Sequence, residues 1–275
     1  MKQVLIVGCG DLGTGTGLAL AAEGHQVWGV RRRPEEIPAP INPLAGDFSH
    51  PDDLPDFPRE LDTVYFIATP DEYNDAGYRA AYVDGLANVL ERLESDGLSP
   101  RRVIFVSSTG VYGQNDGSWV EEDSAAEPTR FSGRRLLEAE RMLAEHRFPS
   151  VVVRFAGIYG PGRDGLIRRV REGGTAADKP PRYTNRIHRD DCVGVLCHLF
   201  SLPTPQPLYL GVDDNPCPQT EVMDGIAEIL NLSRPPRETN SRGQNKRCDN
   251  SRLRASGYQL RYPDWRAGYR ALLEG

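Results

Sequence analysis

The residues whose types and spacing most clearly indicate a chemical role form a glycine-rich run directly after the apolar stretch 3–7. This run is Gly8-Cys9-Gly10-Asp11-Leu12-Gly13. Gly8 allows a tight turn, Gly10 lets the backbone approach a pyrophosphate, and Gly13 permits close packing of a helix on a strand. The N–H groups that open the following helix, including those of Asp11 and Leu12, favour phosphate oxygens. With a strand before it and a helical pattern after it, the run predicts a dinucleotide-binding turn. The alternative is a glycine-rich turn without a ligand.

The end of the second predicted strand, residues 26–30, indicates which dinucleotide is favoured. An NAD site places Asp or Glu about 20 residues after the glycines, where it accepts from the ribose 2′-hydroxyl. Here the strand runs into Arg31, Arg32 and Arg33, and no carboxylate stands at that position. Guanidinium groups match a 2′-phosphate bidentately, so the sequence favours NADP(H), with NAD(H) as the other candidate cofactor. The alternative is three solvated arginines on a loop.

Three further motifs point to a family: Val106-Ser107-Ser108-Thr109-Gly110-Val111-Tyr112-Gly113, Arg154-Phe155-Ala156-Gly157-Ile158-Tyr159-Gly160-Pro161-Gly162 and Asn185-Arg186-Ile187-His188-Arg189-Asp190-Asp191. In this order and at these distances, they resemble the extended short-chain dehydrogenase/reductases, the NAD(P)-dependent epimerase/dehydratase family of nucleotide-sugar enzymes. The run 84–88 resembles the family's mid-helix pattern, and Asp47 its adenine-contacting acid. The resemblance extends to about residue 262 and implies a small-molecule substrate such as a sugar nucleotide. It also implies a homodimer through two long helices, 79–95 and 133–146.

The resemblance implies a catalytic set of Ser or Thr, Tyr and Lys, with the Tyr and Lys four residues apart on one helix. Ser108 matches the first position and is expected to hydrogen-bond the substrate oxygen at the reacting carbon. The lysine position matches Arg134 or Arg135, which puts Arg130 or Phe131 where the tyrosine belongs. Neither register supplies a phenol or a lysine. Because arginine hardly deprotonates, we expect Arg134 to hold the nicotinamide ribose in a non-standard catalytic set.

Other phenols are candidates for the missing proton-transfer group. Tyr112 lies in the first of the three motifs, and Tyr73 and Tyr78 follow the predicted strand that ends at Ala68. Loops at the carboxyl ends of parallel strands face the cofactor crevice, so we also expect Ala68 and Thr69 to contact the cofactor. We assign Tyr112 to the catalytic set. For each of these tyrosines the alternative is a packing or surface role. The glycine motif departs from the family too, because one residue separates its first two glycines where two are usual.

Substrate contacts are expected from the second and third motifs. Tyr159, Arg163 and His188 lie where the family shapes its substrate pocket, and His188 is also weighed as a catalytic group. The stretch 161–189 carries eight basic residues against three acidic ones, which suits an anionic ligand such as a sugar diphosphate. The alternatives are a solvated surface and a structural His188.

The elements that must position these residues alternate apolar runs with helical patterns. Strands are predicted at 3–7, 26–30, 63–68, 102–107 and 150–155, and helices at 12–22, 79–95 and 133–146. This alternation predicts an α/β fold, a Rossmann-type doubly wound parallel sheet, over residues 1–160. Residues 161–275, with a helix at 221–230, are expected to form a smaller substrate lobe partly interleaved with the main sheet. The proline-rich segment 33–58 is expected to be irregular.

Composition excludes several classes of function. The 275 residues carry a net charge of −6, which argues against a nucleic-acid partner. Apolar runs never approach ~18 residues, so no membrane partner is expected. The five cysteines are scattered without a CxxC pair, which indicates a cytoplasmic protein with reduced thiols and no metal site. Two functions stay open: an NADP(H)-dependent oxidoreductase or epimerase acting on a sugar-nucleotide-like substrate, and a non-catalytic NADP(H) redox sensor.

Overall fold

The computed structural model describes residues 1–239 and 243–274, which divide into two compact units. Unit 1 comprises 1–111, 128–154 and 193–209, and unit 2 comprises 112–127, 155–192 and 210–275. The sequence predicts a boundary at residue 160 with a second lobe partly interleaved with the main sheet. In the structure the segment 112–127 packs with later residues and the segment 193–209 packs with earlier ones.

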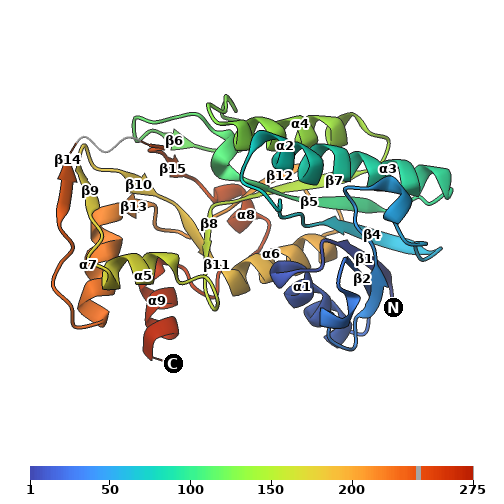
Figure 1. The fold of residues 1–275 in the computed structure, drawn as a ribbon, viewed down its shortest axis with the longest axis horizontal. Helices are drawn as coiled ribbons and strands as arrows, with labels where there is room; N and C mark the ends of the chain where they lie inside the picture. The colour runs from blue at the N-terminus through green and yellow to red at the C-terminus, as the bar shows by residue number, and fades with distance from the viewer. Residues whose placement is uncertain (240–242, 275) are drawn as a thin grey trace. The chain divides into compact units, whose positions relative to one another are not determined.

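Unit 1 is built on a parallel sheet with the strand order β12-β7-β5-β4-β1-β2-β3 (Figure 1). The strands are β1 (Gln3–Val7), β2 (Gln26–Arg31), β3 (Asn42–Ala45), β4 (Leu61–Phe66), β5 (Arg102–Ser108), β7 (Ser150–Phe155) and β12 (Leu208–Gly211). Val7 pairs with Val30 of β2 on one side and with Phe66 of β4 on the other. The strand order therefore reverses at β1, as in a doubly wound sheet. The predicted Rossmann-type α/β fold is confirmed.

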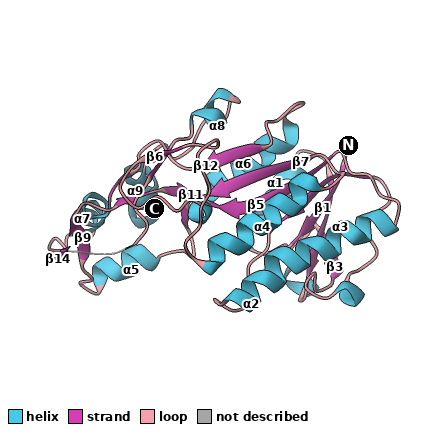
Figure 2. Ribbon diagram, turned by 90° about the horizontal axis from the view of Figure 1, so that it is seen from above, coloured by secondary structure: helices cyan, strands magenta, loops and turns pink. Residues whose placement is uncertain are grey.

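Helices cover both faces of this sheet. The helices α1 (Asp11–Ala22) and α6 (Arg189–Ser201) lie on one face, and α3 (Gly85–Ser95) and α4 (Phe131–Glu145) lie on the other, where Figure 2 shows them side by side. On α3 the buried residues recur with helical spacing at Leu86, Val89, Leu90 and Leu93. The helix predicted at 79–95 begins earlier, because α2 (Asp75–Tyr78) and a π-helical turn (Arg79–Asp84) lead directly into α3.

Strand β3 was not expected from the sequence. Its residues Asn-Pro-Leu-Ala are mostly exposed and show no strand pattern. It lies at the edge of the sheet, where a proline is tolerated because one side needs no ladder hydrogen bonds. The Asn42 side chain donates to the Val27 carbonyl at 3.0 Å. Short 3-10 turns at 34–36 and 51–53 flank it within the predicted irregular segment.

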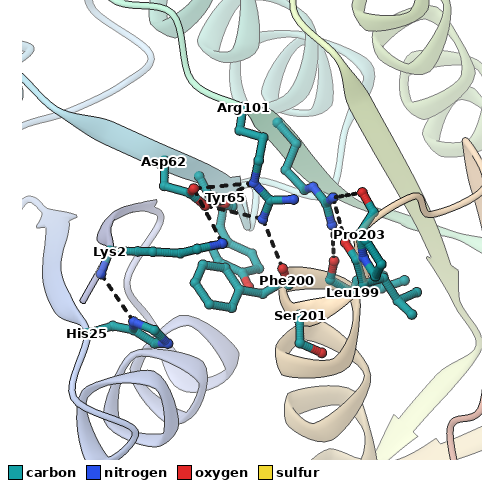
Figure 3. Close-up of polar contacts among 12 residues, drawn as sticks. Lys2, His25, Asp62, Tyr65, Arg101, Leu199, Phe200, Ser201 and Pro203 are labelled. Atoms are coloured by element: carbon teal, nitrogen blue, oxygen red, sulfur yellow. Dashed lines mark hydrogen bonds and ion pairs between the residues drawn. The ribbon is translucent and has the colours of Figure 1, made fainter.

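The amino-terminal edge of the sheet is held together by arginines (Figure 3). Arg101 forms an ion pair with Asp62 at 3.2 Å and donates to the Phe200 carbonyl at 3.0 Å. Arg102 donates to the Leu199 carbonyl and, at 2.7 Å, to the carbonyl of Leu202, the residue after α6. These carbonyls belong to the C-terminal end of α6, where the helix dipole favours cations. The amino edge therefore serves stability, and the opposite, carboxyl edge carries the motifs.

Unit 2 consists of short strands and helices around its own apolar core. Strands β8 (Gly157–Tyr159) and β11 (Arg186–His188) pair in parallel, as do β9 (Ala176–Lys179) with β14 (Arg237–Thr239) and β6 (Trp119–Val120) with β15 (Arg247–Cys248). Strands β10 (Tyr183–Thr184) and β13 (Cys217–Pro218) pair antiparallel. The helices are α5 (Gly165–Arg171), α7 (Gln219–Ile229), α8 (Ser251–Ala255) and α9 (Trp265–Glu274). The predicted helix at 221–230 corresponds to α7.

Within the described parts of both units, no helix is long and apolar enough to cross a membrane. The same residues contain no group of three His, Cys, Asp or Glu side chains placed to hold a metal ion.

Candidate functional site

The glycine turn between β1 and α1 is shaped by close backbone packing. Gly8 has a φ of +85°, and a Cβ there would stand 2.2 Å from the carbonyl oxygen of Ile67. At Gly13 a Cβ would lie 2.8 Å from the Gly8 oxygen, whereas at Gly10 no atom lies within 4 Å. Gly8 and Gly13 therefore allow backbone segments to approach each other, and Gly10 leaves open space that a ligand can enter.

A pocket of about 520 Å³ opens at the carboxyl ends of β1, β2 and β4, and we call it the glycine-turn pocket. Its lining includes six of the predicted cofactor-binding residues: Gly8, Gly10, Arg31, Arg32, Asp47 and Thr69. Asp11, Leu12, Gly13 and Ala68 are not in the lining, although the first three belong to the opening turn of α1. They form the N-terminal turn of α1, the end at which a helix directs its N–H groups toward a phosphate.

The arginines at the end of β2 are paired with carboxylates. Arg32 donates to both oxygens of Asp71, at 2.7 and 2.6 Å. Arg31 forms an ion pair with Glu36, and Arg33 binds the same carboxylate at 2.5 Å. Glu36 lies in the turn that follows β2, whereas Asp71 comes from the loop after β4 and is brought to the arginines by the fold. The predicted 2′-phosphate site is therefore a charge-balanced cluster.

Asp47 takes part in the same cluster and is stabilised as an anion. The Ser49 hydroxyl and backbone N–H donate to it at 2.5 and 3.0 Å, and Arg32 lies 3.8 Å away. Partial burial works to raise the pKa of Asp47, but these contacts outweigh burial and hold its pKa below the ordinary value. The Arg32 hydrogen bonds lower the pKa of Asp71 as well. Both carboxyl groups are therefore ionised at neutral pH.

Ser108 stands at the end of a strand that is fixed by a buried ion pair. It is half-buried, and its Oγ accepts from the Gly110 N–H at 3.0 Å. The preceding Ser107 donates to Glu140 of α4 at 2.5 Å, and Glu140 binds Arg154 of β7 at 2.5 Å. All three side chains of this triad are buried. They tie β5, α4 and β7 together, so the Ser108 backbone is well placed to hold a hydroxyl in one position.

The first turn of α4 places two arginines where the family's lysine belongs. Arg134 is exposed and donates to the Thr129 carbonyl at 3.0 Å. Arg135 binds both oxygens of Asp75, at 2.9 and 2.7 Å, and reaches Glu138 at 2.7 Å. These hydrogen bonds raise the pKa of Arg135 further. Neither arginine lines the glycine-turn pocket.

Two of the candidate phenols, Tyr73 and Tyr78, contact Phe131. This residue stands at the family's tyrosine position when Arg135 is aligned with the lysine. The Phe131 ring lies 5.4 Å from the rings of both Tyr73 and Tyr78, in edge-on geometry. The Tyr73 side chain is 69% exposed, and burial raises the pKa of Tyr78. Tyr82 completes this aromatic cluster and donates to the Ala68 carbonyl at 3.3 Å.

Two other candidate groups, both in unit 2, have structural partners instead. Tyr112 is fully buried and its hydroxyl donates to the Glu121 carbonyl at 2.8 Å. His188 is 2% exposed, and its Nδ1 accepts from the Asp190 N–H at 3.2 Å, at the start of α6. Burial lowers the pKa of His188 and keeps the ring neutral. Both groups therefore have backbone partners in the structure, and the catalytic role of Tyr112 and the substrate role of His188 stay predictions.

A second pocket, of about 340 Å³, lies within unit 2, and we call it the Tyr159 pocket. Tyr159 and Arg163, both predicted as substrate residues, line it, whereas His188 does not. Arg186 also lines it, although it is only 5% exposed, and donates to Thr184 at 2.5 Å. Two arginines beside neutral polar groups suit an anionic ligand.

Several lining residues of the glycine-turn pocket were not predicted. Asp71 and Glu72 follow Thr69 closely, and the rule that carboxyl-end loops face the crevice could have found them. The segment after β3 contributes Phe48, Ser49 and His50. These could not be predicted because β3 itself has no strand pattern in the sequence.

A doubly wound sheet with a glycine turn after its first strand defines a Rossmann-type protein. The chain belongs to the NAD dependent epimerase/dehydratase family, whose model matches residues 4–197. It is 29% identical to Protein YeeZ of Escherichia coli K12 over 283 residues, covering 96% of this chain and 97% of YeeZ. A solved structure from Methylobacillus flagellatus, itself assigned only provisionally as an NAD-dependent epimerase/dehydratase, shares 38% identity with a TM-score of 0.82. That match covers 99% of this chain and 98% of the other.

Two more distant solved structures show the same fold. MoeE5 in complex with UDP-glucuronic acid and NAD is 23% identical, with a TM-score of 0.80 over 99% of this chain and 98% of that one. The human epimerase family protein SDR39U1 with NADPH is 20% identical, with a TM-score of 0.78 over 99% of each chain. At these identities the likeness concerns the fold alone.

Proposed function

We propose that this chain is an NADP(H)-dependent oxidoreductase or epimerase of the epimerase/dehydratase family. The observation that carries the proposal is the glycine-turn pocket, which combines open space at Gly10 with two arginines, Arg31 and Arg32, at the end of β2. Guanidinium groups there suit a ribose 2′-phosphate. Proteins of the same fold have been solved with NAD and with NADPH, so NAD(H) is the competing cofactor.

We propose a sugar-nucleotide-like substrate, and the Tyr159 pocket supports this choice. Arg163 and Arg186 give that pocket two cationic side chains, and Thr184 and Gln219 add neutral hydrogen-bonding groups. A diphosphate presents several acceptor oxygens that match such a lining. The UDP-glucuronic acid complex of MoeE5 shows that the fold accommodates a ligand of this class in another protein.

The proposed chemistry assigns roles to this chain's own residues. A bound nicotinamide would supply the hydride exchange. The Ser108 hydroxyl orients the substrate oxygen, and Arg134 holds the nicotinamide ribose. For proton transfer the aromatic cluster offers Tyr73 and Tyr78, which contact Phe131, in preference to the buried Tyr112.

A second function, a non-catalytic NADP(H) redox sensor, is favoured by one specific observation. The first turn of α4 contains neither phenol nor lysine, and one of its arginines is fully engaged by Asp75 and Glu138. The arginines of such a turn could hold a bound dinucleotide but would relay protons poorly. Turnover, and not binding, separates the two functions.

The test measures cofactor binding first and turnover second. We expect calorimetric titration to show NADPH binding, and a panel of UDP-sugars to change the absorbance of the bound nicotinamide. Ser108→Ala should lower the rate about 100-fold while leaving NADPH affinity unchanged. Ser95→Ala, at an exposed serine ending α3, is the control. An unaltered rate in Ser108→Ala would remove Ser108 from the mechanism, and cofactor binding without any exchange would favour the sensor.

We propose a cytoplasmic location, because no disulfide links the five cysteines. A homodimer formed through α3 and α4 stays a prediction, which sedimentation analysis would check.

A further inference from the structure

The Arg32–Asp71 pair is a bidentate contact between two loops of the glycine-turn pocket. Arg32 follows β2 and Asp71 follows β4, and both line the pocket. Their two hydrogen bonds measure 2.7 and 2.6 Å, which is the fork-to-fork geometry that arginine also uses with phosphate. The side chains are 58% and 67% exposed, so solvent and ligands reach them.

Asp71 is the main partner of Arg32 in this cluster. The other nearby carboxylate, Asp47, lies 3.8 Å from Arg32 and is already bonded by the Ser49 hydroxyl and N–H. Arg31 forms an ion pair of its own with Glu36. A ligand phosphate that needs the Arg32 fork must therefore displace Asp71 in particular.

We propose that Asp71 sets the choice between NADPH and NADH by competing with the 2′-phosphate for Arg32. The inference rests on the proposed dinucleotide binding at this pocket. A 2′-phosphate has to break two charge-assisted hydrogen bonds and then lies close to the displaced carboxylate. A 2′-hydroxyl carries no charge and leaves the Arg32–Asp71 pair intact. Asp71 thus reduces the preference for NADP(H) over NAD(H) that the arginines alone would give.

The chain offers a matched control for the loss of one charge. Asp75 forms the same bidentate, exposed contact with Arg135, at 2.9 and 2.7 Å, and lies four residues further along. It does not line the glycine-turn pocket. Asp71→Asn and Asp75→Asn therefore remove the same charge from the same kind of pair, and only the first removes it from the pocket.

The experiment measures dissociation constants of NADPH, NADH and adenosine 2′-monophosphate for the wild type and both variants by titration calorimetry. In Asp71→Asn we expect NADPH and adenosine 2′-monophosphate to bind about 5- to 10-fold more tightly, with NADH unchanged. The gain should shrink as salt is added, because it is electrostatic. Asp75→Asn should behave as the wild type, and Arg32→Met should weaken NADPH while sparing NADH.

Three results would overturn the inference. Unchanged NADPH affinity in Asp71→Asn, with a wild type that binds NADPH, would show that Asp71 does not compete and would leave the proposed function standing. Equal gains in both Asp variants would assign the effect to net charge. A wild type that binds neither dinucleotide would refute the proposed function itself, and this inference with it. Thermal unfolding of each variant confirms that the compared proteins are folded.

Discussion

The glycine-turn pocket is shaped mainly by backbone atoms, whereas the Tyr159 pocket is shaped mainly by side chains. The glycine-turn pocket depends on backbone atoms, because a Cβ at Gly8 would stand 2.2 Å from the Ile67 oxygen. The Tyr159 pocket depends on buried polar side chains, with Tyr159 4% and Arg186 5% exposed. Behind this lining, Asp213 is 2% exposed and donates its backbone N–H to the Arg186 carbonyl at 2.7 Å. The first should tolerate changes of side-chain chemistry but not of backbone shape. The second should respond to protonation and to single hydroxyl groups.

The largest expected effect follows from adding a methyl group to the backbone-built pocket. Gly8→Ala should lower the free energy of unfolding by up to about 6 kcal/mol, from left-handed strain together with overpacking. NADPH binding should be lost in whatever fraction stays folded, because β1 and β4 must separate at the turn. Urea denaturation and calorimetry measure the two effects.

Gly24→Ala distinguishes the backbone strain of a positive φ from the steric clash of a new Cβ. Gly24 has nearly the same φ, +86°, but no atom lies within 4 Å of its would-be Cβ. We expect it to lower the free energy of unfolding by about 1–2 kcal/mol from strain alone. Equal losses in the two variants would show that close packing of Gly8 on Ile67 does not shape the pocket.

The next effect concerns protonation in unit 2. Burial raises the pKa of Asp213 to about 7, and its Oδ2 has no hydrogen-bond partner among the described residues. An unfolded Asp loses its proton near pH 4, so between pH 4 and about 7 the folded chain binds more protons. The free energy of unfolding should therefore fall as pH rises through this window, by up to about 4 kcal/mol.

Asp213→Asn should flatten this pH dependence, as urea denaturation at a series of pH values would reveal. The control Asp123→Asn removes an exposed carboxylate of unit 2, and the wild-type slope should persist there. A slope that survives in Asp213→Asn would assign the pH dependence to other groups.

The smallest effect is expected at Tyr159, whose buried hydroxyl has no hydrogen-bond partner among the described residues. Tyr159→Phe should leave the free energy of unfolding unchanged or raise it by up to about 1 kcal/mol, because an unsatisfied buried group is removed. Tyr258→Phe is the matched comparison, because the Tyr258 hydroxyl donates to Asp191 Oδ1 at 2.9 Å. Tyr258→Phe should lower the free energy of unfolding by about 1–2 kcal/mol. If Tyr159→Phe loses as much, a water or another group satisfies that hydroxyl in solution.

Much of unit 1 could be predicted because its elements carry local patterns. The apolar run of β1 is followed at once by glycines, and both the strand and the turn formed where expected. Strand β3 was missed because an edge strand of Asn-Pro-Leu-Ala is held by pairing with β2 and not by its own residues. The missing phenol of α4 was also evident, since the residue types at 130 and 131 exclude it in either register.

The sequence by itself determined the glycine turn, the buried strands and the absence of the usual tyrosine, because these depend on residue types at neighbouring positions. Only the tertiary structure decided that Arg32 is bound by Asp71, that Tyr112 and His188 are buried with backbone partners, and that Tyr73 and Tyr78 surround Phe131. Charge pairing and burial depend on which distant segments the fold brings together. A run of three arginines therefore predicts positive charge, and the fold determines how much of that charge is left for a ligand.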